Sequence, residues 1–356
     1  MELRLTGARS YATYSRATGQ LLSFKRGQWV PVETDFDWEW LLSGSGMKFD
    51  ENPYLGPRLI GSEVTKQFDR DPAQRLLVCR GRGLGDVLLL IPALREWKRR
   101  YPESTVAVTV DRGYRHFFYG SQWVDQALDY QQAYDMAPWD AVVDLNYYAE
   151  RSEYDTVLHR SVVFGQGLGL DDVGDLHTEY AVGDDARDQA RKLLSQRLGP
   201  IVAVQTHAST PARAPDERKM WRLMRALQAD HCCVVALGSV VIPVPRGVLD
   251  LQGHCSLAVT AAVMEQADVV VGLDSGLTHI ANALDCRVVA LFGPGNPALR
   301  VAGHPQCTPV QVHEYGKCAA PCCDHRLTHC RMRPLCLQRY PEELVVAAVR
   351  EQLCQQ

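Results

Sequence analysis

Residues 75–102 have the sequence RLLVCRGRGLGDVLLLIPALREWKRRYP. An apolar run typical of a buried strand leads into three closely spaced glycines, Gly81, Gly83 and Gly85, and then into a segment with the pattern of an amphipathic helix. A glycine turn between a strand and a helix lets backbone amides approach a ligand closely. The stretch therefore predicts the first strand, turn and helix of an α/β ligand-binding fold.

Asp86 stands where a dinucleotide-binding G-x-G-x-x-G turn would have its third small residue, and no G-K-[ST] follows as in a P-loop. Both of these nucleotide-binding motifs are excluded. Two interpretations of Asp86 remain open from the residues alone. It caps the helix, as Asp commonly does, or it is a carboxylate at the end of the first strand, facing the cleft where α/β proteins bind ligands.

Strand-like and helical segments alternate along most of the chain, which predicts parallel sheets covered by helices. One series begins near Gln74 and a second near Gly199. We expect an α/β protein with two Rossmann-like domains facing each other across a cleft, preceded by a small β-rich module. The expected divisions are a β-rich module and linker at 1–72, domains at 73–180 and 181–340, and a C-terminal helix at 341–356.

The composition excludes several classes of protein. The chain has 356 residues, of which 46% are hydrophobic, so it can bury a large core. No apolar run approaches the roughly 20 residues of a membrane span, and the first residues lack a signal-peptide core, so we expect a cytoplasmic protein without a transmembrane segment. A formal net charge of -4 gives no overall field that would attract nucleic acid or an anionic membrane.

A second informative stretch is ADVVVGLDSGLTHIANALDCRVVALFGPGNP, residues 267–297. An apolar strand ends at Asp274-Ser275-Gly276 and a helix begins at once, so free amides, a hydroxyl and the helix dipole converge on one point. This pattern predicts an anion-binding site, and His279 lies one helical turn after Ser275 on the same face. The alternative is that Asp274 or Ser275 caps the helix and His279 is a structural histidine.

Together, GDVLLLIPALREWKRRYP and DSGLTHIANALDCRVVALFGPGNP resemble the heptosyltransferase-type family of glycosyltransferases. The resemblance covers roughly residues 74–353 and leaves residues 1–72 outside it. It implies the GT-B fold, in which the first domain is the acceptor side and the second binds the nucleotide sugar. It also implies an inverting transfer that needs no catalytic cofactor or metal.

Position by position, the resemblance makes Asp86 the general base that takes the proton from the acceptor hydroxyl. It places the donor on the D-[ST]-G-x-x-H segment and on the segment DERKMWRLM, whose Lys219 would be the cation on the phosphates. Without the resemblance, Lys219 is a solvated helix lysine, and the stretch PARAPDE before it departs from the family pattern. The implied donor-binding residues are Gly85, Thr206, Lys219, Asp274, Ser275, Gly276, Leu277, Thr278 and His279, with Ser209 and Thr210 as weaker candidates.

Several of the 12 cysteines gather in residues 318–336, CAAPCCDHRLTHCRMRPLC. Four thiolates, those of Cys318, Cys322, Cys330 and Cys336, are suited to a structural zinc or iron ion. Some relatives in the resembled family that modify protein acceptors bind iron there. The spacing is irregular and lacks paired C-x-x-C knuckles, so buried free thiols are the alternative.

The acceptor is not specified by these motifs. The resemblance favours ADP-heptose as donor and the lipopolysaccharide core as acceptor, which would bring the protein to the inner face of the membrane. A protein side chain or a modified base of phage DNA is an alternative, because basic and aromatic residues alternate in residues 1–30, a composition that binds phosphates and bases. The acidic run Glu33–Glu39 weakens the nucleic-acid alternative. A protein that binds nucleotide sugars or serves assembly without catalysis also remains open.

Overall fold

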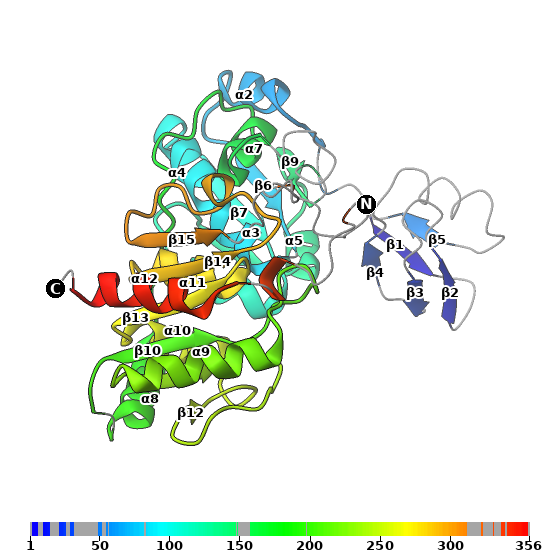
Figure 1. The fold of residues 1–356 in the computed structure, drawn as a ribbon. Helices are drawn as coiled ribbons and strands as arrows, with labels where there is room; N and C mark the ends of the chain where they lie inside the picture. The colour runs from blue at the N-terminus through cyan, green and yellow to red at the C-terminus, as the bar shows by residue number, and fades with distance from the viewer. Residues whose placement is uncertain are drawn as a thin grey trace.

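The computed structural model describes residues 55, 57–81, 83–146, 148, 157–196, 198–311, 322, 330, 336–338 and 340–354, and the backbone of five strands within residues 2–51. These five strands form an antiparallel sheet of order β4-β1-β5 and a hairpin of β2 and β3. In Figure 1 they lie to one side of the remaining elements. Their bounds are β1 (Glu2–Leu5), β2 (Ser10–Tyr14), β3 (Leu21–Lys25), β4 (Trp29–Pro31) and β5 (Phe49–Glu51).

The first α/β half is built on a four-stranded parallel sheet of order β8-β7-β6-β9. In this sheet β7 and β6 are central, and β8 and β9 lie at its two edges. The strands are β6 (Arg75–Cys79), β7 (Thr105–Thr109), β8 (Gln126–Leu128) and β9 (Ala141–Asp144). The helices of this half are α2 (Ser62–Phe68), α3 (Leu84–Leu89), α4 (Ile91–Arg100), η1 (Arg112–Phe118), α5 (Tyr130–Asp135) and α7 (Arg160–Gly167).

The second half contains a six-stranded parallel sheet of order β12-β11-β10-β13-β14-β15, the order of a doubly wound Rossmann sheet. The strands are β10 (Ile201–Gln205), β11 (Cys233–Leu237), β12 (Leu249–Asp250), β13 (Val269–Leu273), β14 (Val288–Phe292) and β15 (Cys307–Gln311). The helices are α8 (Asp184–Leu194), α9 (Glu217–Ala229), α10 (Leu257–Glu265), α11 (Gly276–Ala283), η3 (Pro297–Leu299), η4 (Cys336–Gln338) and α12 (Glu342–Cys354).

Strand alternation places apolar side chains on both faces of each sheet. In β6, Leu76 and Val78 enter one buried cluster while Leu77 and Cys79 enter another. The larger cluster is continuous through both halves, and a separate cluster lies under α9 and α12 on the other face of the second sheet. Figure 1 shows α12, in red, beside that sheet.

The amphipathic segment after the glycine turn forms two helices rather than one. Helix α3 ends at Leu89, and α4 begins at Ile91 with Pro92 in its first turn. Proline has no N–H to donate to the preceding turn, so the helical hydrogen bonding is interrupted there. The short α3 carries Asp86, while the longer α4 packs against α7.

The two halves meet where α3 packs against α11. A Cβ added to Gly276, the first residue of α11, would lie 2.6 Å from Leu84 Cδ2, and one added to Gly85 would lie 2.5 Å from His279 Cδ2. Only glycine allows these two helix starts to approach so closely. Among the helices of the described residues, none has the length and apolar composition that crossing a membrane requires.

Candidate active site

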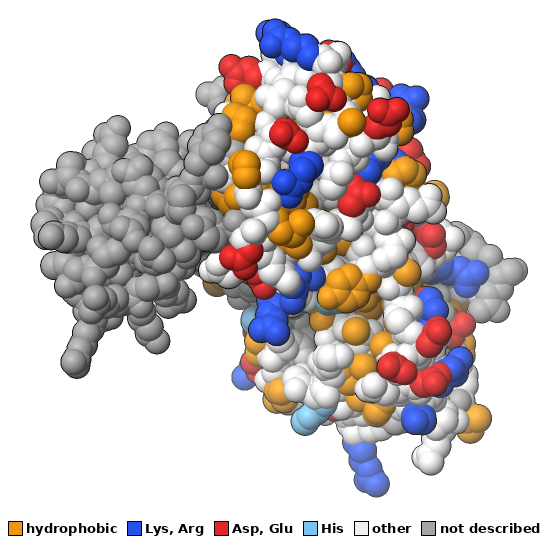
Figure 2. All heavy atoms as spheres, turned by 180° about the vertical axis from the view of Figure 1, so that it is seen from behind, with side chains coloured by type: hydrophobic (Ala, Val, Ile, Leu, Met, Phe, Trp, Pro, Cys, Tyr) orange, Lys and Arg blue, Asp and Glu red, His pale blue; other side chains and the backbone are white. Residues whose placement is uncertain are grey.

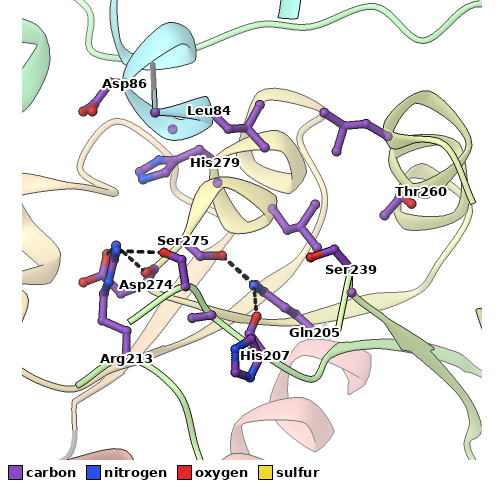
Figure 3. Close-up of a pocket in the computed structure, with 18 of the residues that line it drawn as sticks. Leu84, Asp86, Gln205, His207, Arg213, Ser239, Thr260, Asp274, Ser275 and His279 are labelled. Atoms are coloured by element: carbon purple, nitrogen blue, oxygen red, sulfur yellow. Dashed lines mark hydrogen bonds and ion pairs between the residues drawn. The ribbon is translucent and has the colours of Figure 1, made fainter. Parts of the chain in front are cut away.

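A cavity of about 1400 Å³ lies between the two halves. Its walls come from the carboxyl ends of parallel strands β6, β10, β11 and β13 and from the first turns of α3 and α11. In the second sheet, β10 and β13 are the adjacent strands at which the order reverses, the point where open α/β sheets bind ligands. The close-up in Figure 3 shows the side chains that line it.

Asp86 lies in the first turn of α3 and lines the cavity. The helix has Gly83 at its N-cap and no side-chain cap hydrogen bond, so Asp86 does not act as the cap. Gly83 has a φ of 80°, and a Cβ there would lie 2.6 Å from Asp86 Oδ2. The glycine turn therefore makes room for the carboxylate to sit over it.

The Asp86 carboxylate faces two buried arginines. Oδ2 accepts a hydrogen bond from Arg80 Nη2 at 2.5 Å, and Oδ1 lies 3.2 Å from Arg160 Nε. Burial disfavours the charged carboxylate, but the guanidinium groups of Arg160, Arg80 and Arg300 outweigh it and hold the pKa of Asp86 below 3.8. Asp86 is therefore an ionised carboxylate at neutral pH, able to accept a proton.

Ser275 is the N-cap residue of α11, yet its hydroxyl makes no cap hydrogen bond. It instead meets the buried side chain of Gln205 at the end of β10, with Nε2 and Oε1 of Gln205 lying 2.6 and 2.9 Å from Ser275 Oγ. Gln205 Oε1 also accepts from the Leu273 amide at 3.1 Å. Gln205 thus holds residues 273–275 in place, so that the first turn of α11 faces the cavity.

Arg213 brings a positive charge to the same side. Its Nη1 donates to the backbone carbonyl of Asp274 at 3.0 Å and lies 4.0 Å from Asp274 Oδ1, while Nε donates to Thr210 Oγ1 at 3.0 Å. Figure 3 shows Arg213, Asp274 and Ser275 grouped on one side of the cavity. A guanidinium group beside a helix N-terminus is an arrangement suited to a phosphate.

His279 lines the cavity but is only 6% exposed and packs against Gly85. Burial, together with the positive charge of nearby Arg300, lowers the pKa of His279 to about 3, although Asp86 opposes the shift. His279 is therefore neutral at neutral pH and offers a hydrogen bond rather than a charge.

Most of the predicted donor residues reach the cavity, whereas Thr206, Thr278, Lys219 and the weaker candidate Thr210 do not line it. Gly85, Asp274, Ser275, Gly276, Leu277 and His279 line it. Thr206 lies beneath it, where its hydroxyl donates to Gln252 Oε1 at 2.7 Å, and Thr278 donates to the carbonyl of Leu273 at 2.5 Å. These two threonines hold the loops behind the cavity surface.

Lys219, predicted as the cation on the phosphates, also lies outside the cavity lining. Its Nζ donates to the Tyr340 carbonyl at 2.9 Å and pairs with Glu342 at 3.1 Å. Lys219 therefore joins α9 to the start of α12 on the outer face of the sheet. Residues 211–216 carry Arg213, rather than Lys219, to the cavity.

The far end of the cavity is less charged. Ser239, Val240, Cys255, Leu257 and Thr260 line it, from the loop after β11 and the start of α10. Figure 3 shows Ser239 and Thr260 on the side away from Asp86 and Arg213. The cavity thus has the charged groups of Asp86 and Arg213 on one side and a mixed polar and apolar lining on the other.

Most of residues 318–336 lie outside the described residues, but three of the four predicted ligand cysteines are described. Cys318 is outside the described residues, whereas Cys322 is exposed and Cys330 and Cys336 are half-buried. Within the described part of the chain, no group of three or more His, Cys, Asp or Glu residues is arranged to hold a metal ion. The metal site at Cys318, Cys322, Cys330 and Cys336 stays a prediction.

Several cavity residues carry no signal in the local sequence. Arg160 begins α7 and Arg300 follows η3, and only the fold brings them to Asp86. Tyr114, on η1, also lines the cavity. Arg80, directly after β6 and before the glycine turn, had a detectable signal, because a charged residue at the end of a buried strand is unusual.

Comparisons with known proteins agree with this architecture. The family model of glycosyltransferase family 9 (heptosyltransferase) matches residues 125–325, more than half of the chain. A search of curated protein sequences gave no match.

Solved structures align over most of the chain. A glycosyltransferase of family 9 from Veillonella parvula aligns with a TM-score of 0.65 at 15% identity, covering 80% of this chain and 98% of that one. E. coli ADP-heptose lipopolysaccharide heptosyltransferase II gives 0.60 at 15% identity, covering 79% and 99%.

The iron-containing dodecameric glycosyltransferase TibC of enterotoxigenic E. coli gives 0.63 at 17% identity, covering 80% of both chains. A TibC structure in complex with ADP-D-β-D-heptose aligns with 99% of this chain and 93% of that one, with a TM-score of 0.60 at 15% identity. From the match of the family model and the two facing parallel sheets, the chain belongs to glycosyltransferase family 9, the heptosyltransferase family, and has the GT-B fold.

Proposed function

We propose that this glycosyltransferase moves heptose from ADP-heptose to an acceptor hydroxyl, with inversion at the anomeric carbon and Asp86 as general base. One observation carries the proposal. An ionised carboxylate held by arginines faces the same cavity as the N-terminus of α11, which suits a leaving phosphate. The base and the anion site thus lie on opposite halves of the molecule, with room for a sugar between them.

The donor fits the second half of the cavity. Its diphosphate would lie at the first turn of α11, beside Ser275 and Arg213, and its nucleoside would extend toward Ser239 and Thr260. ADP-heptose is the favoured donor because the E. coli heptosyltransferase II and the TibC complex are both described with it. This arrangement leaves the anomeric carbon on the side of Asp86.

The reaction is a single displacement. The acceptor oxygen forms a bond to the anomeric carbon as its proton passes to Asp86, and the bond from that carbon to the phosphate oxygen breaks with its electrons on ADP. Arg213 and the amides of α11 would stabilise the charge that develops on the leaving phosphate. The low pKa of Asp86 suits a proton transfer that occurs late in the displacement.

The acceptor would enter on the side of Asp86, where Leu89, Tyr114 and Arg300 line the cavity. A lipopolysaccharide core glycan is favoured, because heptosyltransferase II is described as acting with lipopolysaccharide. A protein acceptor is the main alternative. A nucleic-acid acceptor has less support, since basic and acidic side chains are interspersed on the face of the described residues that Figure 2 shows, with no continuous basic patch there.

We propose that no cofactor takes part in the chemistry. Any metal ion at the cysteines would have a structural role, as Cys336 begins η4, which leads into α12. A Cβ added to Gly293, after β14, would lie 3.2 Å from Cys336 Cβ, so the cysteine is next to the second sheet. The iron-containing description of TibC makes iron the first ion to consider there.

Asp86→Asn tests the proposal. The amide keeps the size of the side chain but cannot take a proton, so we expect transfer to fall by at least about 100-fold. Binding of ADP-heptose should change little, because the donor contacts lie on the second half. Transfer is measured by mass spectrometry of acceptor glycans and peptides, the configuration of the product by NMR, and donor binding by calorimetry.

Asp185→Asn is the matched control, since it neutralises an exposed carboxylate at the start of α8, outside the cavity. It should keep the parent rate. Transfer by Asp86→Asn at the parent rate would remove Asp86 as base. A product that retains the anomeric configuration of the donor would overturn the proposed displacement.

A further inference from the structure

The two carboxylate oxygens of Asp86 have different surroundings. Oδ2 accepts a hydrogen bond from Arg80 Nη2 at 2.5 Å, and Arg80 is only 3% exposed and lies behind the cavity wall. Oδ1 lies 3.2 Å from Arg160 Nε, and Arg160 is part of the cavity lining. Oδ2 therefore faces a guanidinium group behind the cavity wall, and Oδ1 faces the guanidinium group of a residue that lines the cavity.

Arg80 is itself held from several directions. Its Nη1 donates to the backbone carbonyl of Leu145 at 3.2 Å and to that of Asn146, both just beyond β9. Its guanidinium carbon lies 5.5 Å from the centre of the Phe164 ring on α7. The backbone amide of Arg80 donates to the Thr109 carbonyl at the end of β7 at 3.0 Å. The guanidinium group of Arg80 is thus fixed relative to the sheet, and its hydrogen bond holds Asp86 in place.

We propose that Arg80 is a positioning residue for the transfer reaction, which anchors Asp86 Oδ2 so that Oδ1 is the oxygen that takes the acceptor proton. The inference rests on the proposed role of Asp86. As the acceptor O–H bond breaks, its proton goes to Oδ1, and the acceptor oxygen bonds to the anomeric carbon while ADP leaves with the electron pair. Arg160 stands beside Oδ1 and balances its charge before the proton arrives.

The charges around Asp86 give this arrangement a measurable signature. Four groups face it from the elements packed around it: Arg80 after β6, Arg160 on α7, Arg300 after η3, and His279 on α11, which is neutral. Burial raises the pKa of Asp86 and the arginines lower it. Without Arg80, less positive charge offsets the effect of burial, so the pKa of Asp86 should rise. The acid limb of the pH–rate profile should then move to higher pH.

The experiment compares the pH dependence of kcat in the full chain and three variants. Arg80→Met removes both the anchor and the charge, and we expect kcat to fall by about 100-fold, the order of loss caused by a small misplacement of a catalytic group. The KM for ADP-heptose should stay within about threefold of the parent value, since the donor contacts are untouched. The acid limb of the kcat profile should move to higher pH by about one unit or more, because a positive charge that lowers the pKa of Asp86 is lost.

Arg80→Lys keeps the charge but cannot hold Oδ2 and the two carbonyls together. It should keep the acid limb of the parent protein while losing part of kcat. Arg75→Met is the matched control for loss of a packed arginine. Arg75 begins the same strand, stacks on Trp139 at 4.3 Å, and donates to the carbonyls of Met136 and Pro138, away from the cavity. It should leave kcat and its pH profile unchanged.

The inference is overturned if Arg80→Met or Arg80→Lys keeps the parent kcat and pH profile, or if the loss appears in KM alone. These outcomes differ from failure of the proposed function. A parent protein that transfers no sugar, or an active Asp86→Asn variant, would remove the base itself. If the parent is active, Asp86→Asn is inactive and Arg80→Met is unaffected, only the role proposed for Arg80 is wrong. If Arg80→Met does not fold, the Arg80→Lys comparison decides.

Discussion

Arg213 supplies the positive charge on the donor side of the cavity, and its effect on donor binding is testable. Arg213→Ala should weaken binding of ADP about 10- to 100-fold, because a hydrogen bond to a charged group is worth about 1.5 to 3 kcal/mol. Calorimetry with ADP measures the change. Lys219→Ala is the control, because Lys219 pairs with Glu342 and lies away from the cavity. A larger loss of affinity in Lys219→Ala than in Arg213→Ala would contradict the placement of the diphosphate beside Arg213.

The cavity residues that follow a strand directly were predictable, and those that depend on the fold were not. Asp86 follows the glycine turn after β6, and Ser275 lies two residues after β13, at the sheet edge where ligands bind. Local pattern and family motif pointed to both positions, and both line the cavity. Arg160 and Arg300 reach Asp86 only because α7 and η3 come together in space. Lys219, which a short motif placed on the phosphates, instead contacts Tyr340 and Glu342 in the structure, because the path of the backbone decides where its side chain points.

The close approach of α3 and α11 explains two glycines that a binding motif alone does not. Gly276→Ala would place a Cβ about 2.6 Å from Leu84, inside the packed junction of the two halves. We expect a loss of about 1 to 3 kcal/mol in the free energy of unfolding, the usual cost of overpacking, measured by urea denaturation. Gly113→Ala is the control, because a Cβ there meets nothing within 4 Å and should be nearly neutral. Equal stability of the two variants would contradict the steric role of Gly276.

Central and edge strands differ in how well the sequence predicts them. The central strands β6, β10, β13 and β14 are buried on both faces, so each is an almost unbroken apolar run. The edge strands are shorter or more exposed. β12 is the pair Leu249–Asp250, and β15, with the sequence CTPVQ, is only half-buried. These edge strands form by pairing with a neighbouring strand, and no local apolar pattern predicts them.

The segment between α7 and α8, residues 168–183, holds the two halves of the molecule together, as does the contact between α3 and α11. Arg95, on α4, donates to the backbone carbonyls of Asp175 and His177 at 2.8 and 2.7 Å. On the other side, Thr178 Oγ1 lies 3.1 Å from His304 Nε2, and the Tyr180 amide donates to the Ala283 carbonyl at 2.9 Å. The segment therefore contacts both halves, which holds the two walls of the cavity in fixed positions relative to each other.

Buried histidines lie along this junction. His159 precedes α7 in the first half, while His279 and His304 belong to the second. Burial is the main cause that lowers their pKa values, to about 4 for His159 and His304 and about 3 for His279. All three are neutral at neutral pH. In the unfolded chain the same side chains take up protons near pH 6.5.

The junction should therefore make the protein acid-sensitive. Between pH 6.5 and about 4 the unfolded chain binds more protons than the folded one, so the free energy of unfolding falls as the pH falls. Each extra proton contributes about 1.4 kcal/mol per pH unit. Urea denaturation at pH 7.5 and at pH 5.5 measures the loss. His304→Gln, which keeps a polar group near Thr178, should reduce the pH dependence by about one proton, whereas the exposed His254→Gln should leave it unchanged. Equal stability of the parent protein at both pH values would show that these histidines do not link acid stability to the junction.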